Sequence, residues 1–169
     1  MIKLVFIFFV LISFVSVFSQ TDSCACCNPE NDQFDFWVGK WEVYDTLDNY
    51  VGKNEIIKQY ENCLIQENWI SKGINRGTSY NYYNPADSSW NQLWIDNQGT
   101  ILELKGSFNM NKMVLKSGLQ RGKKIDWYYH QISWEPLTSR NVKQTWDLFD
   151  KNGNKLRNLF TGIYKPFGK

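Results

Sequence analysis

The sequence has few of the features by which enzymes and metal proteins are usually recognised. It contains one histidine, His130, so a His-rich metal motif is excluded. It also has no phosphate-binding glycine loop, no dinucleotide-binding fingerprint, no Gly-x-Ser-x-Gly nucleophile motif and no paired-carboxylate signature. These absences leave enzymatic activity open, but they make a non-catalytic role the stronger expectation.

The chain also lacks a marked excess of charge of either sign. It has 19 basic and 17 acidic residues, a net charge of +2. Phosphate binding needs clustered lysine and arginine. One short basic cluster is present, at Arg121, Lys123 and Lys124, and it is typical of a solvated turn. Nucleic acid is therefore not expected as a partner.

A long apolar run occurs at the N-terminus, where Lys3 precedes residues 4–18. The run is too short and too early for a membrane-spanning helix, and Val17, Phe18 and Ser19 suit a signal peptidase. We therefore expect a signal peptide over residues 1–19, a secreted or periplasmic protein, and no stable membrane span after cleavage. A retained N-terminal anchor and a lipid attached through Cys24 remain alternatives. Removal of Lys3 lowers the net charge to +1.

The four cysteines fit an exported protein. Cys24, Cys26 and Cys27 crowd into a segment over residues 20–33, and the fourth is Cys63. Four sulfurs allow three pairings. A bond between the neighbours Cys26 and Cys27 would be strained, and one from Cys24 to Cys27 closes a very small loop, so we expect one bridge from the cluster to Cys63. A soft-metal site is the alternative, although the sequence lacks the separated CxxC pairs by which zinc sites are recognised.

Short segments rich in aromatic and β-branched residues, separated by Gly, Asn, Asp and Pro, fill the chain from residue 34 to 165. No convincing amphipathic helix interrupts them. Even spacing and tight turns predict an antiparallel meander, and closure into a barrel removes its exposed edges. The predicted fold is all-β, a single up-and-down barrel of about ten strands. The expected strands are 38–47, 52–60, 64–71, 77–83, 90–95, 100–105, 112–117, 124–134, 141–149 and 155–164.

The segment Phe34-Asp35-Phe36-Trp37-Val38-Gly39-Lys40-Trp41-Glu42-Val43 resembles the opening of a bacterial family of lipocalin-like, calycin-type domains, most of them uncharacterised. Further matching pieces follow in order to residue 164: residues 62–69, Gly73, 77–79, 82–84, 90–96 and 144–147. Gly39-Lys40-Trp41 also matches the Gly-x-Trp of lipocalins, in which the tryptophan plugs the closed end. The resemblance implies a β-barrel, and the superfamily suggests binding of small molecules in the lumen.

One pattern recurs on three predicted strands, in which a polar residue and a tryptophan occupy one face. If these faces point inward, the lumen combines aromatic walls with a few polar groups, which is the composition of a binding site. Alternatively, the tryptophans form ordinary core and the polar residues bond to one another. The candidate lumen residues are Trp41, Glu67, Trp69, Gln92, Trp94, His130, Gln144 and Trp146.

His130 has several conceivable roles. It lies on the same strand face as Asp126, Tyr128, Ile132 and Trp134. One role is that of a haem ligand, because nitrobindins are ten-stranded barrels with an axial histidine, but their haem motif is absent here. A general base beside Asp126 and an ordinary structural histidine are the other roles, and the structural one is favoured. No cofactor is predicted, and haem or a soft metal is kept as the alternative.

The favoured function is binding of a small, partly apolar molecule in the lumen. One alternative is an enzyme inside the same barrel, with Glu67 or His130 as acid or base, or with Glu67 and Asp96 as a hydrolytic couple. The other is a structural or interaction protein of the envelope with a filled lumen. Two acids that face one open cavity would favour catalysis, whereas an acid bonded to amides would not.

Overall fold

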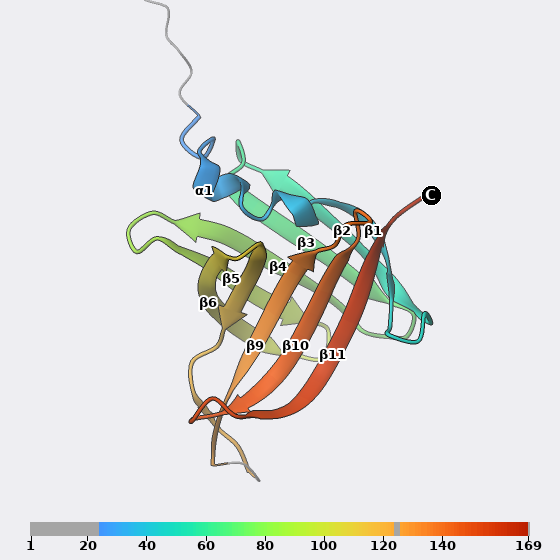
Figure 1. The fold of residues 1–169 in the computed structure, drawn as a ribbon, viewed down its shortest axis with the longest axis vertical. Coiled ribbons are helices and arrows are strands. Elements are labelled where there is room, and N and C mark those ends of the chain that lie inside the picture. The colour runs from blue at the N-terminus through green and yellow to red at the C-terminus, as the bar shows by residue number, and fades with distance from the viewer. Residues whose placement is uncertain (1–23, 124–125, 169) are drawn as a thin grey trace, which may run out of the picture.

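The computed structural model describes residues 24–123 and 126–168, and within them the chain forms an antiparallel β-barrel (Figure 1). The predicted signal peptide lies outside the described residues. The strands are β1 (Gly39–Tyr44), β2 (Tyr50–Gln59), β3 (Leu64–Ser71), β4 (Arg76–Asn84), β5 (Ser89–Asp96), β6 (Ile101–Asn109), β7 (Lys112–Lys116), β8 (Gln120–Arg121), β9 (Trp127–Pro136), β10 (Val142–Asp150) and β11 (Lys155–Pro166).

Ten of these strands close into the barrel. Strands β1 to β7 pair in chain order, β9 follows β7, and β10 and β11 lead back to β1. Every pairing is antiparallel, including the closing pair of β1 and β11, in which Trp41 lies opposite Pro166. The predicted ten-stranded up-and-down barrel is thereby confirmed.

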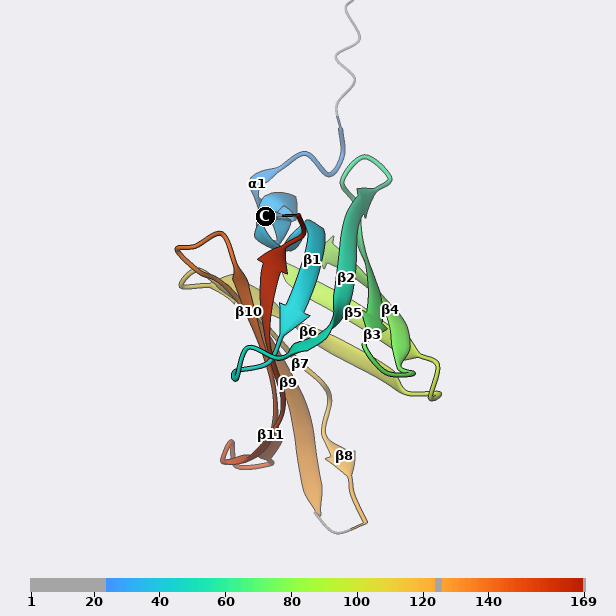
Figure 2. The ribbon, with the colours of Figure 1, turned by 90° about the vertical axis from the view of Figure 1, so that its right-hand side faces the viewer.

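The short strand β8 was not predicted. It pairs with β9 outside the closed ring, with Gln120 opposite Tyr128. Its two residues lie between Gly118 and Gly122 and are too few for any alternation of side chains, so the sequence carries no signal for it. Together with β9 and the β10–β11 hairpin, β8 extends beyond the rest of the barrel at one end (Figure 2).

Alternation of side chains produces the strands and sorts them into an interior and an exterior set. In β7, Met113 and Leu115 are fully buried, and the residues beside them are more exposed. In β6, Leu102 and Leu104 are buried between exposed neighbours. Because side chains alternate in this way around the ring, one face of each of the ten barrel strands contributes to a single core.

The N-terminal segment covers one end of the barrel, which we call the closed end (Figure 1). It contains the helix α1 (Pro29–Asp32), whose N-cap is Asn28, and the 3-10 turn η1 (Asp35–Trp37). Phe34 and Trp37 are completely buried, with stacked rings 4.8 Å apart. Trp41 donates its indole N–H to the Trp37 carbonyl at 2.8 Å. Aromatic packing therefore seals this end.

Two further kinds of contact hold the segment on the barrel. Lys58 of β2 reaches Asp32 at 3.0 Å and Asp35 at 2.6 Å. Disulfides join Cys26 to Cys63 and Cys24 to Cys27. The first bond links the cluster to the β2–β3 turn, as the sequence suggested; the second uses the small loop that sequence reasoning disfavoured. All four sulfurs are thus paired.

The opposite end, which we call the open end, carries the turns that follow β1, β3, β5, β7 and β10. No helix of the described residues is both long enough and apolar enough to cross a membrane.

Candidate functional site

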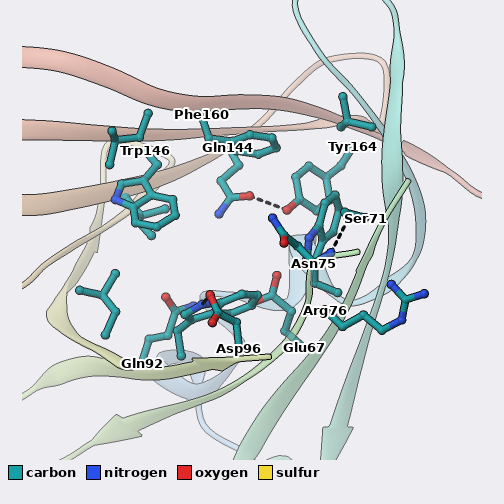
Figure 3. A pocket seen from close by; sticks show the side chains of 16 residues that line it. Glu67, Ser71, Asn75, Arg76, Gln92, Asp96, Gln144, Trp146, Phe160 and Tyr164 are labelled. Carbon is teal, nitrogen blue, oxygen red and sulfur yellow. Dashed lines mark hydrogen bonds between the residues drawn. The ribbon is translucent and has the colours of Figure 1, made fainter. Parts of the chain in front are cut away.

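A cavity of about 380 Å³ occupies the open half of the barrel. The large aromatic side chains of Phe34, Trp37 and Trp134 belong to the buried core at the closed end and do not line this cavity. Figure 3 shows side chains from opposite walls converging on the space between them. The lining residues are Val51, Glu67, Trp69, Ser71, Asn75, Arg76, Gln92, Trp94, Asp96, Leu102, Ile132, Gln144, Trp146, Leu159, Phe160 and Tyr164.

Aromatic rings form much of the wall, and neighbouring glycines make room for them. A Cβ at Gly77 would lie 2.3 Å from Cζ2 of Trp94, and a Cβ at Gly52 would lie 2.7 Å from Cη2 of Trp69. Such distances are far below van der Waals contact, so the indoles rest on the sheet only because these positions lack a side chain. Trp69 also meets Phe160 edge to face, at 6.4 Å between ring centroids.

The deep part of the cavity, which we call the floor, is polar and centres on Glu67. This carboxylate is 5% exposed. Its Oε1 accepts a hydrogen bond from Asn54 Nδ2 at 2.6 Å, and its Oε2 accepts one from Ser79 Oγ at 2.6 Å. Burial raises the pKa of Glu67 above its usual value, although the two hydrogen bonds oppose that shift.

Gln92 continues this network on β5. Its Nε2 donates to Asn81 Oδ1 at 2.7 Å, and Asn81 in turn donates to Ser79 Oγ at 2.9 Å. Across the floor, Tyr164 donates its hydroxyl hydrogen to Gln144 Oε1 (Figure 3). Among the described residues, Gln92 Oε1 receives no hydrogen bond and Gln144 Nε2 finds no acceptor. Both atoms belong to residues that line the cavity, so both can serve a ligand.

Most of the candidate lumen residues come together here. Glu67, Trp69, Gln92, Trp94, Gln144 and Trp146 all line the cavity. Gln92 and Gln144 do not form hydrogen bonds with Glu67, however. The hydrogen-bond partners of Glu67 are Asn54 and Ser79.

Trp41 and His130 do not line the cavity. Trp41 belongs to the aromatic core of the closed end, where its ring meets Tyr164 edge to face at 6.2 Å. His130 lies behind the cavity wall, and its Nδ1 accepts a hydrogen bond from Trp146 Nε1 at 2.9 Å. Burial and the positive charge of Arg157 lower the pKa of His130. The histidine therefore positions a wall residue.

Sequence reasoning missed several residues of the hydrogen-bond network on the floor: Asn54, Ser79, Asn81 and Tyr164. The strand pairing explains the first three, whereas Tyr164 lies opposite Val43 and Val142. Ser79 lies opposite both Glu67 and Trp94, Asn81 lies opposite Gln92, and Asn54 lies opposite Trp69. Cross-strand neighbours on one face touch. A polar residue opposite Glu67, Trp69, Gln92 and Trp94 was the available signal, but it can be used only once the register is known.

Asp96 lines the same cavity as Glu67, but it is committed to a turn at the open end. Its Oδ1 accepts backbone N–H groups of Gln98 and Thr100, both at 2.9 Å. Burial acts to raise the pKa of Asp96, but these hydrogen bonds prevail and lower it. Glu67 is bonded to an amide, so neither acid of the proposed hydrolytic couple is free. Residues 24–123 and 126–168 contain no group of three His, Cys, Asp or Glu side chains that could hold a metal ion.

Comparison with protein-family models gave no match for this chain, and comparison with curated proteins gave no match of significant similarity. The closed ten-stranded antiparallel barrel is consistent with a calycin-like fold.

Proposed function

We propose that this protein binds a small, partly apolar molecule in the lumen of its barrel. One observation carries the proposal: an aromatic-walled cavity of about 380 Å³ contains hydrogen-bonding atoms of Gln92 and Gln144 that no described residue pairs. Ligand sites in proteins typically have volumes of about 300–1,000 Å³, mostly apolar walls and a few placed polar groups. A purely structural core would instead be filled and would pair its polar atoms.

The surroundings of the cavity support the same function. Buried aromatic rings of the described residues seal the closed end, so a ligand would enter from the open end. The similarity of residues 34–43 to lipocalin-like domains agrees with lumenal binding. Two disulfides favour an oxidising compartment, which supports the proposal that the protein acts in the periplasm or outside the cell.

A fluorescent probe tests the proposal with a matched pair of variants. Leu159 and Leu156 lie on β11 and are 36% and 42% exposed, but only Leu159 lines the cavity. Phenylnaphthylamine, which is neutral and apolar, is expected to show saturable binding with a rise in fluorescence. Leu159→Trp narrows the cavity and is expected to weaken binding about tenfold, which corresponds to about 1.4 kcal/mol.

Leu156→Trp provides the control, because it adds the same indole outside the cavity and should leave probe affinity unchanged. Thermal unfolding of both variants shows that each is folded at the temperature of the titration. Absence of saturable binding to the unaltered protein, or an equal loss of affinity in both variants, would refute binding in the lumen.

A further inference from the structure

The hydrogen bonds of the floor run in one direction, towards Glu67. Gln92 donates to Asn81, Asn81 donates to Ser79, and Ser79 donates to Glu67 Oε2. Asn54 donates to Glu67 Oε1 from the other side. Ser79 Oγ accepts from Asn81 at 2.9 Å and donates its own hydrogen to the carboxylate. In this arrangement Glu67 only accepts, as an ionised carboxylate does.

No cation of the described part of the chain neutralises this carboxylate. The ion pairs of residues 24–123 and 126–168 all involve other acids, and both hydrogen-bond donors to Glu67 are neutral. Arg76 lines the cavity without forming an ion pair with Glu67. A buried charge is normally paired, because removing it from water costs several kcal/mol. Within the described residues, Glu67 has no cationic partner.

Around the carboxylate, the cavity offers further groups that attract positive charge. The faces of Trp, Tyr and Phe rings attract cations, with Trp the strongest. The wall supplies Trp69, Trp94, Trp146 and Phe160. Gln92 Oε1, which receives no hydrogen bond from the described residues, adds an acceptor on the same side of the floor as Glu67 (Figure 3).

We propose that the ligand of this cavity carries an ammonium group on an apolar body, with the ammonium at Glu67 and Gln92 and the body against the tryptophans. This inference deepens the proposed lumenal binding and depends on it. A protonated amine has only donors to offer, which match the acceptors Glu67 and Gln92 Oε1. Gln144 Nε2, the free donor across the floor, is left for an acceptor elsewhere on the ligand. A carboxylate ligand would instead place a second negative charge beside Glu67, and an alcohol would leave the buried charge unneutralised.

Two matched probe sets test the head group while the apolar body stays constant. The first is phenethylamine, phenethyl alcohol and 3-phenylpropanoate; the second is octylamine, octanol and nonanoate. Affinities are measured by calorimetry or by displacement of phenylnaphthylamine at neutral pH. In each set the amine is expected to bind at least about tenfold more tightly than the alcohol, because a charge-assisted hydrogen bond is stronger than a neutral one. The carboxylate is expected to bind weakest.

Two variants assign the preference to one acid. Glu67→Gln removes the charge from the floor and is expected to abolish the preference for the amine over the alcohol. Asp96→Asn is the matched control, since it neutralises the other acid of the cavity, and it should retain the preference. Asn keeps a side-chain oxygen for the turn, where Asp96 Oδ1 accepts two backbone N–H groups; Asp96 Oδ2 accepts a hydrogen bond from Trp94 Nε1 at 3.3 Å. Each variant is checked by thermal unfolding, and the comparison of head groups on the unaltered protein tests the inference even if Glu67→Gln does not fold.

Several results would overturn the inference. Equal affinity for amine and alcohol, tighter binding of the carboxylate, or an amine preference that survives Glu67→Gln would each do so. If phenylnaphthylamine still binds in those cases, lumenal binding stands and only the ammonium assignment fails. If neither the fluorescent probe nor any member of the two sets binds, both proposals fail.

Discussion

Trp146 donates its indole N–H to Nδ1 of His130 at 2.9 Å, so a residue of the cavity wall is held by the one histidine of the chain. An Nδ1 that accepts a hydrogen bond cannot carry a proton, so the imidazole is neutral in this arrangement. Protonation of His130 would break the bond and release Trp146. The shape of the cavity is thereby linked to the charge state of a residue outside it.

His130 should make stability sensitive to mild acid. Its pKa is lowered in the folded protein, by burial first and by Arg157 second, so the unfolded chain binds the proton more readily. The contribution of His130 is therefore complete above about pH 6.5 and is lost as the pH falls through the lowered value. We expect the melting temperature to fall more between pH 7.5 and pH 5 in the unaltered protein than in His130→Gln. The same fall in both proteins would contradict this expectation.

Glu67 should have the opposite dependence on pH. Its pKa is raised in the folded protein by burial, so its contribution to stability is complete below its ordinary value and is lost as the pH rises through the raised one. Urea unfolding should show the stability of the unaltered protein declining relative to Glu67→Gln over that range. The slope for one group is at most about 1.4 kcal/mol per pH unit. A difference that is constant with pH would show that Glu67 does not titrate in this way.

Gly77→Ala should disturb the cavity wall without altering any polar group. The added Cβ would lie 2.3 Å from Cζ2 of Trp94 and 3.0 Å from the carbonyl oxygen of Ile95. Overpacking of this kind costs about 1–3 kcal/mol, and the displaced indole should also weaken binding of phenylnaphthylamine. Gly118→Ala is the control, since nothing lies within 4 Å of its Cβ. Unfolding and probe titration of both variants measure the two effects, and similar behaviour of the pair would refute the packing argument.

The two disulfides should contribute unequally. Cys26 and Cys63 are 37 residues apart in sequence, whereas Cys24 and Cys27 are 3 apart. Loop-closure entropy then assigns about 4 kcal/mol to the first bond and less than about 2 kcal/mol to the second. Denaturant unfolding of the Cys26→Ser/Cys63→Ser and Cys24→Ser/Cys27→Ser variants gives the two values. A larger loss from the second variant would show that strain or contacts, not loop length, dominate.

Some features of the protein can be read from its sequence, because they depend on neighbours along the chain. The alternation that buries Met113 and Leu115, and the turn residues between strands, predict ten antiparallel strands and their closure. The strand Leu64–Ser71 has the predicted bounds, and the other barrel strands overlap their predicted ranges. The same alternation places Glu67 and Trp69 on one face, and both line the cavity.

Other features depend on which strands lie side by side, and only the tertiary structure decides them. Asn54 and Ser79 are 13 and 12 residues from Glu67 in sequence, yet the register of β2, β3 and β4 brings both to its carboxylate. Trp41 and Trp69 look alike in the sequence, but the N-terminal segment buries the first in the closed end and leaves the second on the cavity wall. Periodicity specifies the face on which a side chain lies. The depth of that side chain in the barrel, and its partner there, are fixed by strand register and by the segment that covers the closed end.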